Sequence, residues 1–82
     1  MSEYADVKTR KFINALTWLK THKPVEIKKA GKHNLKATCI HNGKAFALPT
    51  SHRKVKKPII EKFAKWLAQN EICAEEEFRD RL

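Results

Sequence analysis

The spacing of apolar residues changes twice along this chain of 82 residues, and each change limits the folds available to it. Over residues 2–21 apolar side chains recur every three or four positions, which is the spacing of one helix face. Between Val25 and Leu48 they alternate with polar side chains, as on half-buried strands. Helical spacing returns from Pro58 to Asn70. The pattern predicts the element order α-β-β-β-α.

The first helix, expected over residues 2–21, carries signals at both ends. Ser2 is a favourable N-cap, and Glu3 and Asp6 place negative charge in the first turn, where the helix dipole favours it. Pro24 ends the helix. Trp18 lies off the main apolar stripe, so it either packs at the helix edge or contacts a partner. The expected buried stripe consists of Ala5, Thr9, Phe12, Ala15, Leu16 and Leu19.

Three strands are expected between the two helices. The first begins at Val25 and turns at Gly31, the second spans residues 33–40, and the third spans residues 44–48. The odd-numbered positions of the second strand are mostly apolar, so they should share the buried face. Asn42-Gly43 predicts a two-residue type I′ hairpin turn, because both residues tolerate a positive φ.

The chain is long enough for one hydrophobic core and too short for two. Residues 1–82 should therefore form a single domain of the α+β class, a three-stranded antiparallel sheet with two helices packed on one face. The second helix should end near Asn70, acting as an αL cap. Residues 74–82 are expected to add a short acidic C-terminal extension with a helical turn.

Positive charge is concentrated in the middle of the chain. Residues 7–70 contain 16 Lys or Arg and two acids, Glu26 and Glu61, a net charge of +14. Such a domain favours a polyanionic partner, either nucleic acid or an anionic membrane. No apolar run approaches the length of a membrane span, and the N-terminus lacks the apolar core of a signal peptide. We therefore expect a cytoplasmic nucleic-acid-binding protein, with RNA as the partner.

Several classes of enzyme are disfavoured. Glu26 and Glu61 lie far apart in the sequence, which argues against a metal-dependent nuclease, and no glycine-rich phosphate loop is present. Cys39 and Cys73 form no CxxC pair, so they are expected to be buried small residues and not zinc ligands. We expect neither a metal nor a small-molecule cofactor.

Histidine is the remaining candidate for catalysis. RNA can be cut without metal when a base removes the 2′-hydroxyl proton and lysines stabilise the charge that develops on the phosphate. His33, at the start of the second strand, fits the base, and Lys32 fits the stabilising role. The alternative is that His33 only ends a strand among solubilising lysines. His22 and His41 are interpreted as solvated loop residues.

Two groups of residues are expected to bind the RNA backbone. One surrounds His33, and the other lies in the basic connection of residues 50–57, which precedes the second helix. Loop lysines and the amides of the first helical turn should converge there on phosphate. The predicted RNA-binding residues are Lys28, Lys29, Lys32, Lys36, His52, Arg53, Lys54, Lys56 and Lys57.

Gly31-Lys32-His33, a hairpin, Pro49, His52 and a basic helix start resemble the HicA family over roughly residues 8–72. The resemblance implies a double-stranded-RNA-binding-like fold and an endoribonuclease toxin that cleaves mRNA and pairs with a HicB-like antitoxin. It implies that His33 is the catalytic histidine and that His52 is the histidine after the third strand. This chain has Lys32 where the motif has Ser, and His52 lies three residues after Pro49 instead of two.

Two other functions fit the same pattern. A non-catalytic RNA-binding module would recognise A-form shape and phosphates through the same lysines. A DNA-binding or antitoxin-type protein is also compatible with the charge, although no helix-turn-helix is evident. Cleavage of RNA separates the first reading from both alternatives.

Overall fold

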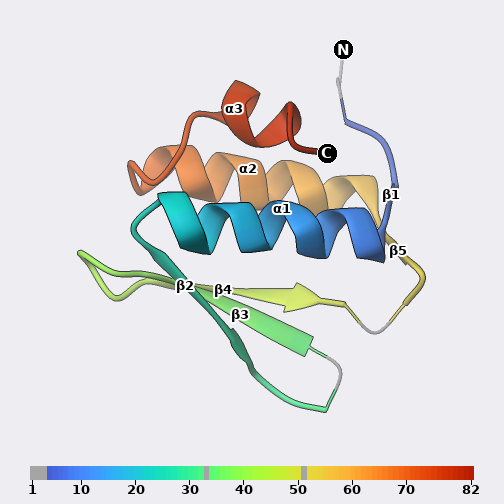
Figure 1. Cartoon of the computed structure of the whole chain (residues 1–82), viewed down its shortest axis with the longest axis horizontal. Helices are drawn as coiled ribbons and strands as arrows, with labels where there is room; N and C mark the ends of the chain where they lie inside the picture. The colour runs from blue at the N-terminus through green and yellow to red at the C-terminus, as the bar shows by residue number, and fades with distance from the viewer. Residues whose placement is uncertain (1–3, 33, 51) are drawn as a thin grey trace.

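The computed structural model describes residues 4–32, 34–50 and 52–82 and has the predicted α+β fold. Three antiparallel strands form a sheet in the order β2-β3-β4, with β2 at Val25–Lys29, β3 at Asn34–Cys39 and β4 at Ala45–Pro49. Two helices, α1 (Thr9–His22) and α2 (Lys57–Gln69), cover one face of this sheet (Figure 1). Both predictions, the sheet and the shared helical face, are confirmed.

The core lies between the sheet and the two helices. Ala37 and Cys39 of β3 and Leu48 of β4 are fully buried, as the alternation of apolar residues predicted. Helix α1 contributes Phe12, Ala15, Leu16 and Leu19, and α2 contributes Ile60, Phe63, Ala64 and Leu67. Ala5, which was expected in the buried stripe of the first helix, is exposed, so that part of the prediction is wrong.

The first helix begins later than predicted. It starts at Thr9, whereas Val7–Lys8 form a short strand, β1, paired antiparallel with β5 (Lys54–Val55). Asp6 therefore lies outside α1 and does not serve its first turn. Ser2 and Glu3 lie outside the described residues. Pairing with a segment far along the chain has overridden the local helical pattern, which is the usual limit of propensity arguments.

The hairpin between β3 and β4 is present, but its turn is not the predicted type I′. Five residues, 40–44, connect the strands. Gly43 has a φ of 74°, whereas Asn42 is not among the residues with positive φ. The Asn42 side chain instead accepts a hydrogen bond from Lys44 N (2.9 Å) and donates one to Asn70 Oδ1 (2.7 Å). These bonds hold the turn against the end of α2.

The end of α2 also differs from the prediction. Asn70 has φ −95° and ψ 11°, and the residue with the left-handed backbone is Glu71, at φ 56°. Asn70 is buried, and its Nδ2 donates to the carbonyl oxygen of Trp66 at 2.8 Å. The same carbonyl also accepts the Asn70 backbone amide at 3.1 Å, so the side chain adds a second hydrogen bond. The αL residue that closes the helix is Glu71, one position later than predicted, and the amides of Glu71 and Ile72 donate to the carbonyl oxygens of Ala68 and Leu67.

The C-terminal segment forms a third layer above the two helices (Figure 1). Helix α3 (Glu75–Arg79) confirms the expected helical turn, and its Phe78 is fully buried. The Phe78 ring meets Phe63 edge-on, with centroids 5.3 Å apart, and Phe12 at 6.2 Å. Lys23 Nζ lies 3.0 Å from Glu77 Oε2. The acidic segment therefore contributes Phe78 to the core, while its Glu77 forms an ion pair at the surface.

Trp18 packs at the edge of α1 and is half-buried. The guanidinium carbon of Arg81 lies 4.4 Å from the centre of the indole ring, and Lys23 Nζ lies 5.7 Å from it. A cation over an aromatic face is a stabilising contact. The contacts made by Trp18 are thus with its own chain, which agrees with the packing alternative.

Candidate nucleic-acid interface

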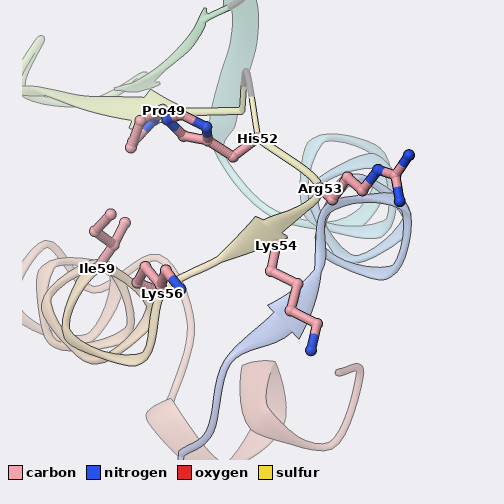
Figure 2. Close-up of a pocket in the computed structure, with 6 residues that line it drawn as sticks. All are labelled: Pro49, His52, Arg53, Lys54, Lys56 and Ile59. Carbon is pink, nitrogen blue, oxygen red and sulfur yellow. The ribbon is translucent and has the colours of Figure 1, made fainter.

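A hollow of about 590 Å³ lies between the end of β4, the following loop and the first turn of α2. Figure 2 shows Pro49 and His52 on one side of it and Ile59 and Lys56 on the other. Arg53 and Lys54 also line it. Of the residues predicted to bind RNA, the structure brings four together here, namely His52, Arg53, Lys54 and Lys56.

The backbone of this loop is held by the start of α1. Thr9 N donates to the carbonyl oxygen of Arg53 at 2.8 Å, and Thr9 Oγ1 donates to the carbonyl oxygen of His52. The pairing of β1 with β5 fixes the next two residues. Because the loop is anchored through its backbone, the side chains of His52, Arg53 and Lys54 remain exposed. The contacts that hold the loop in place thus come from its backbone, which leaves these side chains free of a structural role.

Asp6 caps helix α2 from outside it. Its Oδ1 accepts a hydrogen bond from Lys57 N at 2.8 Å, and its Oδ2 lies 3.5 Å from Lys56 Nζ. The amide hydrogen bond from Lys57, followed by the positive charge of Lys56, lowers the pKa of Asp6 below its usual 3.8. The carboxylate is therefore the form that this site stabilises.

The first amides of α2 are not available to a phosphate, which corrects one expectation. Lys57 N is bound to Asp6, and Pro58 has no amide hydrogen. Ile59 N and Ile60 N both donate to the carbonyl oxygen of Lys56, at 3.0 and 3.2 Å. Any anion bound at this end of α2 must be held by side chains and not by the helix amides.

Two further hollows extend the basic surface past β5. One, of about 510 Å³, is lined by Lys8, Thr9, Arg10, Arg53 and Lys54. The other, of about 300 Å³, adds Lys11 beside Lys8 and Lys54. Since Lys54 lines all three hollows, they adjoin one another. We call this surface the basic face and define it as Lys8, Arg10, Lys11, His52, Arg53, Lys54 and Lys56.

Sequence reasoning missed Lys8, Arg10 and Lys11 as interface residues. All three are exposed, and they were assigned to a helix that was expected to begin at residue 2. Their positive charge was visible, but nothing local joined them to residues 53–56. The joining contact is the β1–β5 pair, in which Lys8 is opposite Lys54. Lys57, by contrast, is half-buried and does not line these hollows.

The other predicted RNA-binding lysines lie at or near the sheet. Lys28 and Lys36 are opposite each other on β2 and β3, both exposed on the face that the helices leave open. Lys28 Nζ lies 3.2 Å from Glu26 Oε2, so part of its charge is compensated. Lys29 and Lys32 are exposed near the β2–β3 connection. The predicted interface therefore consists of two groups of residues.

His33, the predicted catalytic residue, lies outside the described residues. The residue after it, Asn34, is paired with Pro49 at the end of β4. Pro49 lines the hollow shared by His52 and Lys56. Strand β3 thus begins at the same end of the sheet at which β4 ends and the β4–α2 connection begins (Figure 1).

Of the two histidines interpreted as loop residues, His41 lies in the β3–β4 turn, whereas His22 is the last residue of α1, so its placement in a loop is wrong. Both are exposed, and both make contacts. His41 Nε2 lies 2.8 Å from the carbonyl oxygen of Asn70, which ties the β3–β4 turn to the end of α2. The His22 ring lies 5.9 Å from that of Trp18. Neither residue lines the hollows of the basic face.

Both cysteines are buried, as predicted. Burial, together with the negative charge of Glu77, raises the pKa of the Cys73 thiol to about 11. Within residues 4–32, 34–50 and 52–82, no three His, Cys, Asp or Glu side chains are grouped so that they could hold a metal ion. In the same part of the chain, no helix has the length and apolar character needed to cross a membrane.

Comparison of the chain with protein-family models, with curated proteins and with solved structures gives no match.

Proposed function

We propose that this protein binds the phosphate backbone of RNA through the basic face. The observation that carries the proposal is that seven basic or imidazole side chains from α1, β1 and the β4–α2 loop surround three adjoining hollows. Of the described side chains that line them, Asp6 is the one acid, and its carboxylate is engaged by Lys57 N and Lys56. Exposed Lys and Arg side chains of this kind bind phosphates and release counterions.

We further propose that the protein is a HicA-like endoribonuclease toxin that cleaves mRNA in the cytoplasm. His33 would remove the 2′-hydroxyl proton, the 2′-oxygen would attack the adjacent phosphorus, and the bond to the 5′-oxygen would break as that oxygen takes up a proton. Lys32 and the neighbouring lysines would stabilise the charge on the phosphate. Support comes from the HicA-like motif at residues 31–33 and from the pairing of Asn34 with Pro49 beside the basic face. A HicB-like antitoxin is the partner that this function implies.

A non-catalytic RNA-binding module is the second candidate. The basic face accounts for RNA binding without any contribution from His33, and the Lys32 of this chain replaces the Ser of the HicA motif. Incubation of RNA with the protein in the presence of a chelator separates the two functions. Cleavage supports the toxin, whereas binding without cleavage supports the module.

Binding through the basic face is tested with two matched triple variants. One changes Arg53, Lys54 and Lys56 to Ala, and the other changes Lys20, Lys62 and Lys65, which are exposed on α1 and α2 and do not line the three hollows. Both remove three positive charges, so nonspecific attraction changes equally. We expect the first variant to weaken RNA binding roughly tenfold or more and to reduce the salt slope by about 2, at about 0.7 per lost phosphate contact.

Lys56 also contacts Asp6, so its replacement could affect the fold. Circular dichroism of both variants checks that they remain folded, as we expect. Equal weakening by the two triple variants would show that RNA recognises the overall charge and not this face. No binding of RNA by the wild-type protein would remove the proposal altogether.

A further inference from the structure

The hollow between β4 and α2 differs chemically from the rest of the basic face. Its walls include the Pro49 ring, the aliphatic side chain of Ile59 and the His52 ring. In Figure 2 the charged ends of Arg53 and Lys54 point away from the space between Pro49 and Ile59. The neighbouring hollow, lined by Lys8, Arg10, Arg53 and Lys54, is cationic instead. An apolar hollow bordered by cations suits a flat apolar group attached to an anionic chain.

We infer that this hollow binds the base of an unpaired nucleotide, so that the RNA recognised by the basic face is single-stranded at that point. The inference rests on the proposed RNA binding and deepens it. The base would lie against the His52 ring and the side chains of Pro49 and Ile59. The phosphates flanking it would meet Lys56 on one side and Arg53 and Lys54 on the other. Unstacked bases are commonly held on aromatic rings, including histidine.

The Phe, Tyr and Trp rings of the described residues are buried in the core or packed against it. Phe12, Phe63 and Phe78 are fully buried. Trp66 stacks on Phe63, and Phe46 contacts both rings at tilted angles. The guanidinium of Arg81 lies over the Trp18 ring. The exposed ring that the fold places beside the cationic side chains is that of His52. Among the described residues, the His52 ring is therefore the one on which a base bound at the basic face would stack.

Base pairing would close this site. A paired base is stacked within the duplex and can enter the hollow only after the duplex opens, at a cost of a few kcal/mol. Backbone contacts alone would bind duplex and single strand through the same phosphates. The preference between the two forms of RNA therefore separates base binding from backbone binding.

The first experiment compares three variants of His52. His52→Phe keeps a ring without a titratable nitrogen, His52→Lys keeps a cation without a ring, and His52→Ala keeps neither. The carbonyl oxygen that Thr9 binds is retained in all three. Affinity is measured by fluorescence anisotropy on a labelled single-stranded 2′-O-methyl RNA, which lacks the 2′-hydroxyl needed for cleavage. We expect Ala and Lys to weaken binding about 5- to 150-fold, as stacking energies per base imply, and Phe to restore it.

The second experiment changes the ligand. The same 2′-O-methyl strand is offered single-stranded, annealed to its complement, and with one abasic position that is moved along the strand. Tighter binding of the single strand, and a loss at one abasic position that disappears in His52→Ala, support the base site.

The failures of the two ideas are distinguishable. Equal affinity for duplex and single strand, with no effect of any His52 variant, overturns the base site and leaves backbone binding in place. Rescue by Lys and not by Phe also overturns it, because His52 would then act as a cation. Loss of binding to every RNA form in the wild-type protein would instead remove the proposed function.

Discussion

At the scale of single residues, Asp6 shows how a correct physical rule can be applied to the wrong partner. Asp6 was expected to complement the dipole of the first helix, because a carboxylate is stabilised near a helix N-terminus. Asp6 does stabilise a helix N-terminus, but it is that of α2, through Lys57 N. Its contact with Lys56 also links the N-terminal segment to the basic face.

This arrangement predicts a pH-dependent contribution to stability. Because the folded state lowers the pKa of Asp6 below 3.8, its contribution is complete above that value and is lost as the pH falls through the folded-state pKa. Asp6→Asn keeps an oxygen that can accept from Lys57 N but removes the charge. We expect a lower free energy of unfolding near pH 7 and a difference from wild type that shrinks toward pH 3, measured by urea denaturation.

Glu76→Gln, at an exposed position of α3, is the matched loss of one negative charge. If Asp6→Asn and Glu76→Gln had the same effect at every pH, the cap of α2 would not depend on the charge of Asp6.

The proposed chemistry also depends on one residue. His33→Ala is expected to slow RNA cleavage about 10²- to 10⁴-fold, which is the usual contribution of a general base, while RNA affinity changes little. The measurement is the cleavage rate of labelled RNA under saturating protein with a chelator present. His22→Ala, remote from the hollows of the basic face, serves as the control and should cut at the wild-type rate. Equal rates for both variants would contradict a catalytic role for His33.

At the scale of elements, α3 shows that a short acidic segment can be part of the core. The Phe78 ring contacts one aromatic residue from each long helix, Phe12 and Phe63. Lys23–Glu77 and Arg81–Trp18 contacts add to the attachment on the α1 side. The exposed acids of α3 are hydrated wherever the segment lies, so they do not fix its position, and the buried Phe78 ring does.

Removal of that ring should therefore destabilise the whole domain. Phe78→Ala is expected to lower the free energy of unfolding by about 3–5 kcal/mol, the range for a buried Phe. Since that loss could unfold a domain of this size, Phe78→Leu provides a milder variant with a smaller loss of the same sign. Glu76→Ala, on the exposed side of α3, should stay within about 0.5 kcal/mol of wild type. If both Phe78 variants had the same free energy of unfolding as the wild type, α3 would not be part of the cooperative fold.

At the scale of the whole molecule, the charge distribution matches the layered fold. The acids of residues 75–77 lie in α3, the layer on the far side of the helices from the sheet (Figure 1). The basic face lies where β1, β5, the start of α1 and the first turn of α2 meet. An anion is thus attracted to one end of the domain, which can orient an approaching nucleic acid.

The salt dependence of RNA binding tests this distribution. If three to six of the basic side chains meet phosphates of a single strand, log affinity should fall linearly with log salt at a slope between about −2 and −4. Titrations of the same RNA over a range of salt concentrations provide the slope. An affinity independent of salt would rule out binding dominated by the backbone. If the slope were steep but unchanged in the Arg53, Lys54 and Lys56 triple variant, RNA would bind to a different surface of the protein.

The amino-acid sequence alone determined the helices, the three strands, their antiparallel order and the buried faces. These features depend on side-chain periods of about 3.6 and 2, which are local. Leu16 and Ala37 are buried for this reason. Of the candidate interface, the sequence identified His52, Arg53, Lys54 and Lys56, and His33 stays a prediction.

The tertiary structure decided which distant residues share a surface. Asp6 caps a helix that begins 51 positions later, and Lys8 pairs with Lys54. The same contacts bring Arg10 to the basic face and place the His52 ring beside Pro49 and Ile59. They also occupy the Lys57 amide of α2, which is therefore not available to a phosphate. No local pattern encodes such pairs, because a polar group can be satisfied by any suitable partner and chain closure decides which partner comes within reach.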